Sequence, residues 1–63
     1  NPNGIDPNYF YGDYLFRSGD YAGAEQALNK ALQAPAREGR KLADEGRRKE
    51  INELLEKIRE KQR

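Results

Sequence analysis

Apolar side chains recur along this chain with the spacing of α-helices. The clearest case lies in the middle of the chain, where intervals of four, three and one residues place the apolar positions on one helix face. These positions are Ala24, Leu28, Ala31 and Leu32. Apolar positions are denser before this segment and return at helical intervals after it, among many charges. The pattern predicts an all-α fold of three helices.

The first predicted helix runs from about Pro7 to Ser18. We expect Asp6 to cap its start, because an aspartate oxygen can accept from the first free amides. Proline at the first helical position loses no hydrogen bond that the helix needs. Apolar residues surround most of this helix, which predicts burial on more than one side. They are Tyr9, Phe10, Tyr11, Tyr14, Leu15 and Phe16.

A second helix, from about Tyr21 to Ala34, is predicted after the turn Ser18-Gly19-Asp20. Gly19 can take the left-handed conformation that ends a helix, and Asp20 can cap the next one. So short a link implies antiparallel neighbours. Glycine and alanine let two helices approach closely. We therefore expect the crossing to bring Tyr11, Gly12 and Leu15 against Ala24, Leu28 and Ala31.

The third predicted helix is longer and amphipathic, from about Leu42 or Asp44 to about Lys61. Pro35 and Gly39 interrupt helical periodicity before it and indicate a connector. Its apolar side would consist of Ala43, Gly46, Ile51, Leu54, Leu55 and Ile58. The chain then divides into a lead-in (1–6), a helix-turn-helix (7–34), a connector (35–41) and a C-terminal helix (42–63).

Composition excludes several kinds of chemistry. The 63 residues include no Cys, His or Met, so a disulfide framework, a thiolate or imidazole zinc site and a catalytic cysteine are ruled out. The paired carboxylates fall on a charged helix face rather than in a cleft, and the Asp spacing does not fit an EF-hand. We therefore predict no catalytic residue, no metal and no cofactor, and a protein that is not an enzyme.

The sequence contains no apolar run long enough to span a bilayer and no signal peptide, so we expect no membrane partner. The absence of cysteine is compatible with any compartment, of which the cytoplasm is favoured. A domain this small buries only about 60% of its unfolded surface, and such domains usually need a disulfide, a metal or a partner chain. With the first two excluded, association remains, and we expect a homo-oligomer, a dimer in the simplest case.

Charge is distributed unevenly. Residues 1–36 contain two basic and four acidic side chains, whereas residues 37–63 contain ten basic and seven acidic ones. The basic excess within 37–49 makes a small nucleic-acid-binding domain the alternative function. Interleaved acids weaken the field of this stretch, and no aromatic residue lies in it to stack on a base. A solvated helix start is the favoured interpretation, so nucleic acid is not the expected partner.

Residues 5–36 resemble one tetratricopeptide repeat (TPR), a helix-turn-helix of about 34 residues with the pattern W-x2-L-G-x2-Y, A-x3-F and P. Gly12 and Ala24 fit the glycine and alanine of the pattern. Tyr11, Leu15 and Leu28 stand for its leucine, tyrosine and phenylalanine. The segments Gly19-Asp20-Tyr21 and Lys30-Ala31-Leu32 also look like the family.

Two positions depart from the family pattern. Asn8 stands where the tryptophan belongs, and Pro35 comes one residue before the expected proline. A generic helical hairpin, which also needs small residues at its crossing, therefore stays open as an alternative. The third helix looks like the polar-backed helix that closes a repeat array. The chain would then be a fragment, or an engineered piece, of a larger repeat protein.

The resemblance implies a non-enzymatic scaffold that binds protein or peptide. In the family, the concave recognition face is formed mainly by the first helix of each hairpin, on the side turned from its own second helix. Helical spacing places four residues together on that side here, and we predict them as ligand-binding: Tyr9, Asp13, Phe16 and Arg17. The alternative, kept open, is that this face meets a preceding repeat or a second copy.

Overall fold

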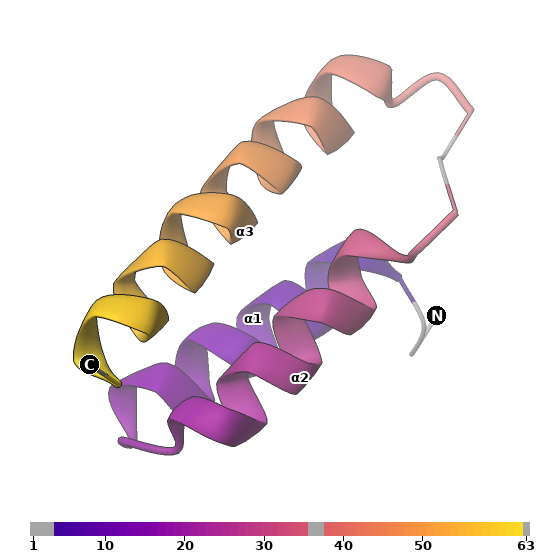
Figure 1. Ribbon diagram of the computed structural model, residues 1–63. Helices are drawn as coiled ribbons and strands as arrows, with labels where there is room; N and C mark the ends of the chain where they lie inside the picture. The colour runs from indigo at the N-terminus through magenta and orange to yellow at the C-terminus, as the bar shows by residue number, and fades with distance from the viewer. Residues whose placement is uncertain (1–3, 36–37, 63) are drawn as a thin grey trace.

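The computed structural model describes residues 4–35 and 38–62, which form three α-helices and no strand (Figure 1). Helix α1 spans Ile5–Arg17, α2 spans Tyr21–Leu32 and α3 spans Lys41–Lys61. Helix α2 runs back along α1, and α3 lies along this pair with its C-terminal end beside the α1–α2 turn (Figure 1). The predicted all-α fold of three helices is confirmed. Residues 1–3 of the lead-in, Ala36 and Arg37 of the connector, and Arg63 lie outside the described residues.

The turn between α1 and α2 forms as its residues predict. Gly19 has a φ of 87°, the left-handed conformation that costs glycine no strain. The amides of Gly19 and Asp20 donate to the carbonyls of Phe16 and Leu15, which satisfies two of the free acceptors in the last turn of α1. The Asp20 carboxylate in turn accepts from the Gly23 amide at 2.9 Å and caps α2. One short segment therefore ends one helix and starts the next.

Helix α1 begins at Ile5, two residues before the predicted start, and Asp6 does not cap it. Gly4 is the capping residue and, having no side chain, it supplies no side-chain capping hydrogen bond. Ile5 is 2% exposed and belongs to the core. Burying an isoleucine stabilises by about 1.5–3 kcal/mol, whereas a helix cap contributes about 1 kcal/mol, which explains the earlier start. Pro7 is tolerated because the first-turn amides have no helical partner.

The two helices of the hairpin cross closely at Gly12. A Cβ atom added to Gly12 would lie 2.8 Å from both Cγ and Cδ2 of Leu28, and 3.4 Å from the Ala24 carbonyl oxygen. Real carbon atoms do not approach so closely, so only glycine fits here. Tyr11 does not join this contact as predicted, since it is 56% exposed. The inner face of α1 instead uses Ile5 and Asn8 beside Gly12.

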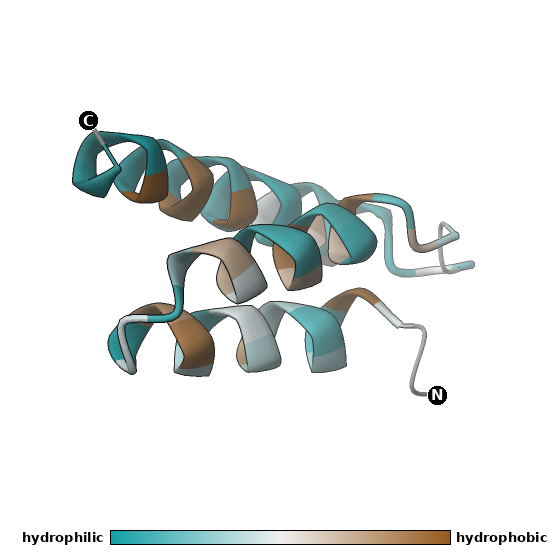
Figure 2. Cartoon of the chain, turned by 60° about the horizontal axis from the view of Figure 1, so that its bottom comes forward, coloured by the Kyte–Doolittle hydropathy of each residue, from teal (hydrophilic) through white to brown (hydrophobic). Residues whose placement is uncertain are grey.

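Helix α3 packs on the hairpin with its second half. The buried residues there are Ile51, Leu54, Leu55 and Ile58, as predicted from their spacing. Figure 2 shows their apolar bands turned toward the hairpin. Ala43 and Gly46, predicted for the same face, are exposed. Leu42 is 83% exposed, so the first turns of α3 bury no apolar side chain.

The aromatic residues of α1 divide into two groups. Tyr9 and Phe16 are half-buried and pack against the core. Phe10, Tyr11 and Tyr14 are 57%, 56% and 63% exposed. Helices α2 and α3 therefore leave one side of α1 uncovered.

Candidate functional site

An open groove of about 290 Å³ lies between α1 and α3. Its α1 wall consists of Tyr9, Asp13 and Arg17, which are three of the four residues predicted to bind a ligand. Positions four apart fall on one side of a helix, so these three form one row. The α3 wall consists of Glu50, Glu53, Leu54 and Lys57. The groove is thus bounded by two helices that lie far apart in the sequence.

Charged side chains line most of this groove. Asp13 and Arg17 form an ion pair of 3.1 Å one helical turn apart. The Arg17 side chain is 78% exposed, so the pair contributes little to stability and can be exchanged for a ligand group. Within the described part of the chain, neither Glu53 nor Lys57 makes an ion pair. The groove therefore offers charges of both signs above the half-buried Tyr9 ring.

Arg47 binds α3 to α1 near the Tyr9 end of the groove. Its Nε donates to the Asp6 carboxylate at 3.0 Å, and its Nη1 donates to Glu50 at 3.1 Å. The guanidinium carbon lies 4.6 Å from the Tyr9 ring centroid and 5.0 Å from that of Phe10. A cation over two aromatic faces, with carboxylates at its edge, holds the helices in a defined position.

Phe16, the fourth predicted site residue, does not line the groove. Its ring lies 5.6 Å from that of Tyr21 on α2, in a tilted arrangement, and packs against the core. The helical angle of Phe16 falls between the α2 side and the α3 side of α1, and the contact with Tyr21 draws it toward α2. Phe16 thereby supports the helix that carries Asp13 and Arg17.

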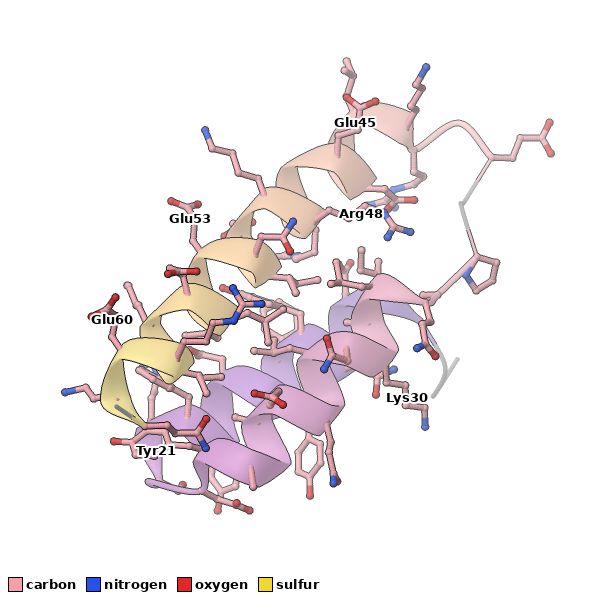
Figure 3. All side chains as sticks on the ribbon, viewed as in Figure 1. Tyr21, Lys30, Glu45, Arg48, Glu53 and Glu60 are labelled. Carbon is pink, nitrogen blue, oxygen red and sulfur yellow. The ribbon has the colours of Figure 1, made fainter. Side chains whose placement is uncertain are left out.

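Arg48 donates hydrogen bonds to backbone carbonyl groups at the C-terminal end of α2. It donates to the Leu32 carbonyl at 2.6 Å and to the Ala34 carbonyl at 3.1 Å (Figure 3). Cations are stabilising at helix C-termini, where free carbonyls gather. Arg47 and Arg48, two of the basic side chains of residues 37–49, are therefore only partly exposed to solvent. Arg37 of that stretch lies outside the described residues.

The sequence pattern did not reveal the structural roles of four residues: Ile5, Asn8, Arg47 and Arg48. Asn8 is 7% exposed, and its side-chain amide donates to the Gly4 carbonyl at 2.9 Å. Ile5, Asn8 and Gly12 are three and four residues apart, a spacing that could have identified the inner face of α1. No local signal marks the contacts of Arg47 and Arg48 with the hairpin, since Asp6 and Leu32 are more than ten residues away from them.

Residues 4–35 and 38–62 contain no group of three acidic or metal-ligating side chains placed to hold a metal ion. None of the helices in these ranges combines the length and the hydropathy needed to cross a membrane. Comparison of the chain with protein-family models, with curated proteins and with solved structures finds no match.

Proposed function

We propose that this chain is a non-enzymatic protein-interaction module of TPR type, in which the groove between α1 and α3 holds an extended segment of another polypeptide. The observation that carries the proposal is that Tyr9, Asp13 and Arg17 line one open groove. Its mixed charges suit peptide, because carboxylates accept from backbone amides and cationic groups while Arg17 and Lys57 can bind carbonyls or acidic side chains. We further propose that the module pairs with itself.

The arrangement of helices supports the TPR assignment. The glycine and alanine that fit the family pattern lie at the closest approach of α1 and α2, where Gly12 faces Leu28 and the Ala24 carbonyl. Helix α3 lies beside this hairpin as the first helix of a following unit would, and leaves a groove on the α1 side. Stacking of this kind is how repeat proteins form extended concave surfaces.

The alternative of nucleic-acid binding through residues 37–49 finds less support. Phosphate binding needs a face of free cations, and Arg47 and Arg48 are engaged with Asp6, Glu50 and the end of α2. Their replacement by phosphate would remove the contacts that hold the first half of α3. The geometry therefore favours polypeptide over nucleic acid as the partner.

Selection of binding peptides from a random library displayed on phage tests the proposal. The strongest peptide would then be titrated calorimetrically into the parent chain and two variants. Lys57→Glu alters the groove, and we expect it to change the affinity by about tenfold or more, equivalent to about 1.4 kcal/mol. Lys49→Glu makes the same change of charge on an exposed position of α3 outside the groove and should leave the affinity unaltered. Equal affinities for all three proteins would contradict binding in this groove.

A further inference from the structure

The two walls of the α1–α3 groove have the same order of charge. Helices α1 and α3 point in the same direction, because the C-terminal end of α3 lies beside the turn that follows α1 (Figure 1). On the α1 wall an acid, Asp13, is followed four residues later by a base, Arg17. On the α3 wall Glu53 is followed four residues later by Lys57. Each wall therefore changes from acidic to basic in the same direction.

Arg47 defines the register of α3 against α1. Its Nε lies 3.0 Å from the Asp6 carboxylate, and its guanidinium carbon lies 4.6 Å from the Tyr9 ring centroid. Position 47 of α3 is thus level with the turn of α1 that contains positions 6 to 9. Every residue advances a helix by about 1.5 Å, so level positions along these parallel helices differ by about forty in residue number.

This register places like charges at the same end of the groove. Glu53 lies level with Asp13, and Lys57 lies level with Arg17, in agreement with their shared lining of one groove. The acidic end lies toward Tyr9, and the basic end lies toward the α1–α2 turn. The groove as a whole therefore has a direction, acidic at one end and basic at the other.

The charges of the two walls do not neutralise each other across the groove. Asp13 pairs with Arg17 along α1, so this wall forms a dipole parallel to the groove. Within the part of the chain that the structure describes, Glu53 and Lys57 form no ion pair, although their spacing permits one. They make a second dipole in the same direction. Two parallel dipoles side by side repel each other, and an opposite dipole between them is attracted to both.

We propose that this groove selects an extended polypeptide segment with one basic and one acidic side chain two residues apart. The inference rests on the proposed function and adds the chemistry of the bound segment. The basic side chain lies at the acidic end, beside Glu53 and Asp13, and the acidic side chain lies at the basic end, beside Lys57 and Arg17. The segment thereby supplies the opposite dipole, with the two unpaired charges of α3 as its main contacts.

The spacing of the charges fits an extended chain. Positions four apart on a helix are separated by about 6 Å along its axis. Side chains two apart in an extended chain point to the same side and are separated by about 6.6 Å. Both charged side chains of such a segment can therefore reach their ends of the groove together, while the side chain between them points out of it.

The groove has too little apolar surface for a bound helix. A helix that binds in a groove presents apolar side chains at intervals of three and four residues to an apolar surface. Among the described residues that line this groove, only Tyr9 and Leu54 are aromatic or aliphatic, and Leu54 is 8% exposed. An extended segment needs no such surface, because it is recognised through its charges and its main chain.

Short peptides of identical composition test the spacing. Each has blocked ends and contains one lysine and one glutamate among serine and threonine, with the two charges adjacent, two apart in either order, or four apart. Titration followed by NMR measures even millimolar dissociation constants. We expect one of the two peptides with charges two apart to bind about tenfold tighter than the peptide with adjacent charges, whose side chains point to opposite sides. Equal affinities for all the peptides, or a preference for charges four apart, would overturn the proposal.

An exchange of charges on α3 tests the direction of the groove. Glu53→Lys combined with Lys57→Glu keeps the composition and the net charge, but it turns the α3 dipole against that of α1. We expect the preferred peptide to bind this protein about tenfold more weakly, with the same affinity as the peptide with adjacent charges. Glu45→Lys combined with Lys49→Glu is the matched control, since it makes the same exchange at exposed positions of α3 outside the groove. The control should bind like the parent, and an unaltered preference in the Glu53/Lys57 exchange would contradict the proposal.

The proposed function and this inference can fail separately. Peptides selected from the random library that lose affinity in Lys57→Glu, yet have no opposite charges two residues apart, would leave peptide binding in this groove standing and overturn the selection of charge. A parent chain that binds neither the library peptides nor the designed ones would overturn both.

Discussion

Gly12 and Gly46 are both glycines inside helices, yet their surroundings differ. A Cβ on Gly12 would lie 2.8 Å from Leu28, whereas a Cβ on Gly46 would meet nothing within 4 Å. Glycine lowers helix stability by about 1 kcal/mol relative to alanine at either position. At Gly12 the close helix crossing offsets that loss, and at Gly46 nothing in the structure does.

Gly12→Leu should therefore be destabilising. The added side chain overpacks the contact with Leu28 and the α2 backbone, at a cost of about 1–3 kcal/mol in a domain with little stability to lose. Urea unfolding followed by circular dichroism measures this change. Gly46→Ala is the matched control and should stabilise by about 0.5–1 kcal/mol. If Gly12→Leu unfolded at the same temperature as the parent chain, α1 and α2 would not be in close contact at Gly12.

The Asp20 cap gives a second prediction at this scale. Asp20→Ala leaves the Gly23 amide without its acceptor and should destabilise by about 0.5–2 kcal/mol. Asp20→Asn keeps an oxygen in the same place and should change stability by only a few tenths of a kcal/mol. Equal losses in the two variants would mean that the charge of Asp20, rather than its hydrogen bond, stabilises α2.

Helix α3 is held by different forces in its two halves. Its second half buries four apolar side chains, whereas its first half contacts the hairpin through the guanidinium groups of Arg47 and Arg48. Polar contacts near the surface weaken with salt more than apolar contacts do. The first turns of α3 should accordingly exchange their amide hydrogens faster than the turns around Ile51 and Ile58.

Arg48→Met tests this division. Methionine keeps most of the apolar stem but removes both hydrogen bonds to the end of α2, and we expect a loss of about 1–2 kcal/mol. Arg59→Met removes only an exposed pair with Glu56 and should alter the unfolding free energy by less than about 0.5 kcal/mol. Identical unfolding midpoints for the two variants would contradict a role for Arg48 in holding α3.

In the molecule as a whole, one side of α1 is aromatic and exposed. If a second copy covers that side, the stability of the fold depends on the protein concentration. A chain that unfolds from a dimer gains stability as its concentration rises. We expect the thermal midpoint of the parent to increase over a hundredfold range of concentration. In Tyr14→Ser, which removes a 63%-exposed ring from that side, the midpoint should vary far less. A parent midpoint that stays constant over that range would argue against pairing.

Local chemistry was enough to predict much of this protein. Helical spacing identified three helices and most of the buried residues of α2 and of the second half of α3, because periodicity within one helix depends only on nearby residues. Gly19 and Asp20 defined their turn for the same reason, and Gly12 predicted the close crossing. Tyr9, Asp13 and Arg17 share one side of α1 by their intervals of four, but it was the resemblance to a TPR that singled out this side as a binding face.

Only the tertiary structure decided how α1 is oriented and how α3 is attached. Helix α1 is apolar on most sides, so its pattern cannot say whether Tyr11 or Asn8 turns inward; the packing of Ile5 beside Gly12 decides it. Arg47 reaches Asp6 of α1 and Arg48 reaches the Leu32 carbonyl of α2, and no local pattern encodes contacts between distant segments. Sequence determines the faces that each helix offers, and packing selects among them, because burial is a property of the assembled helices and not of any one of them.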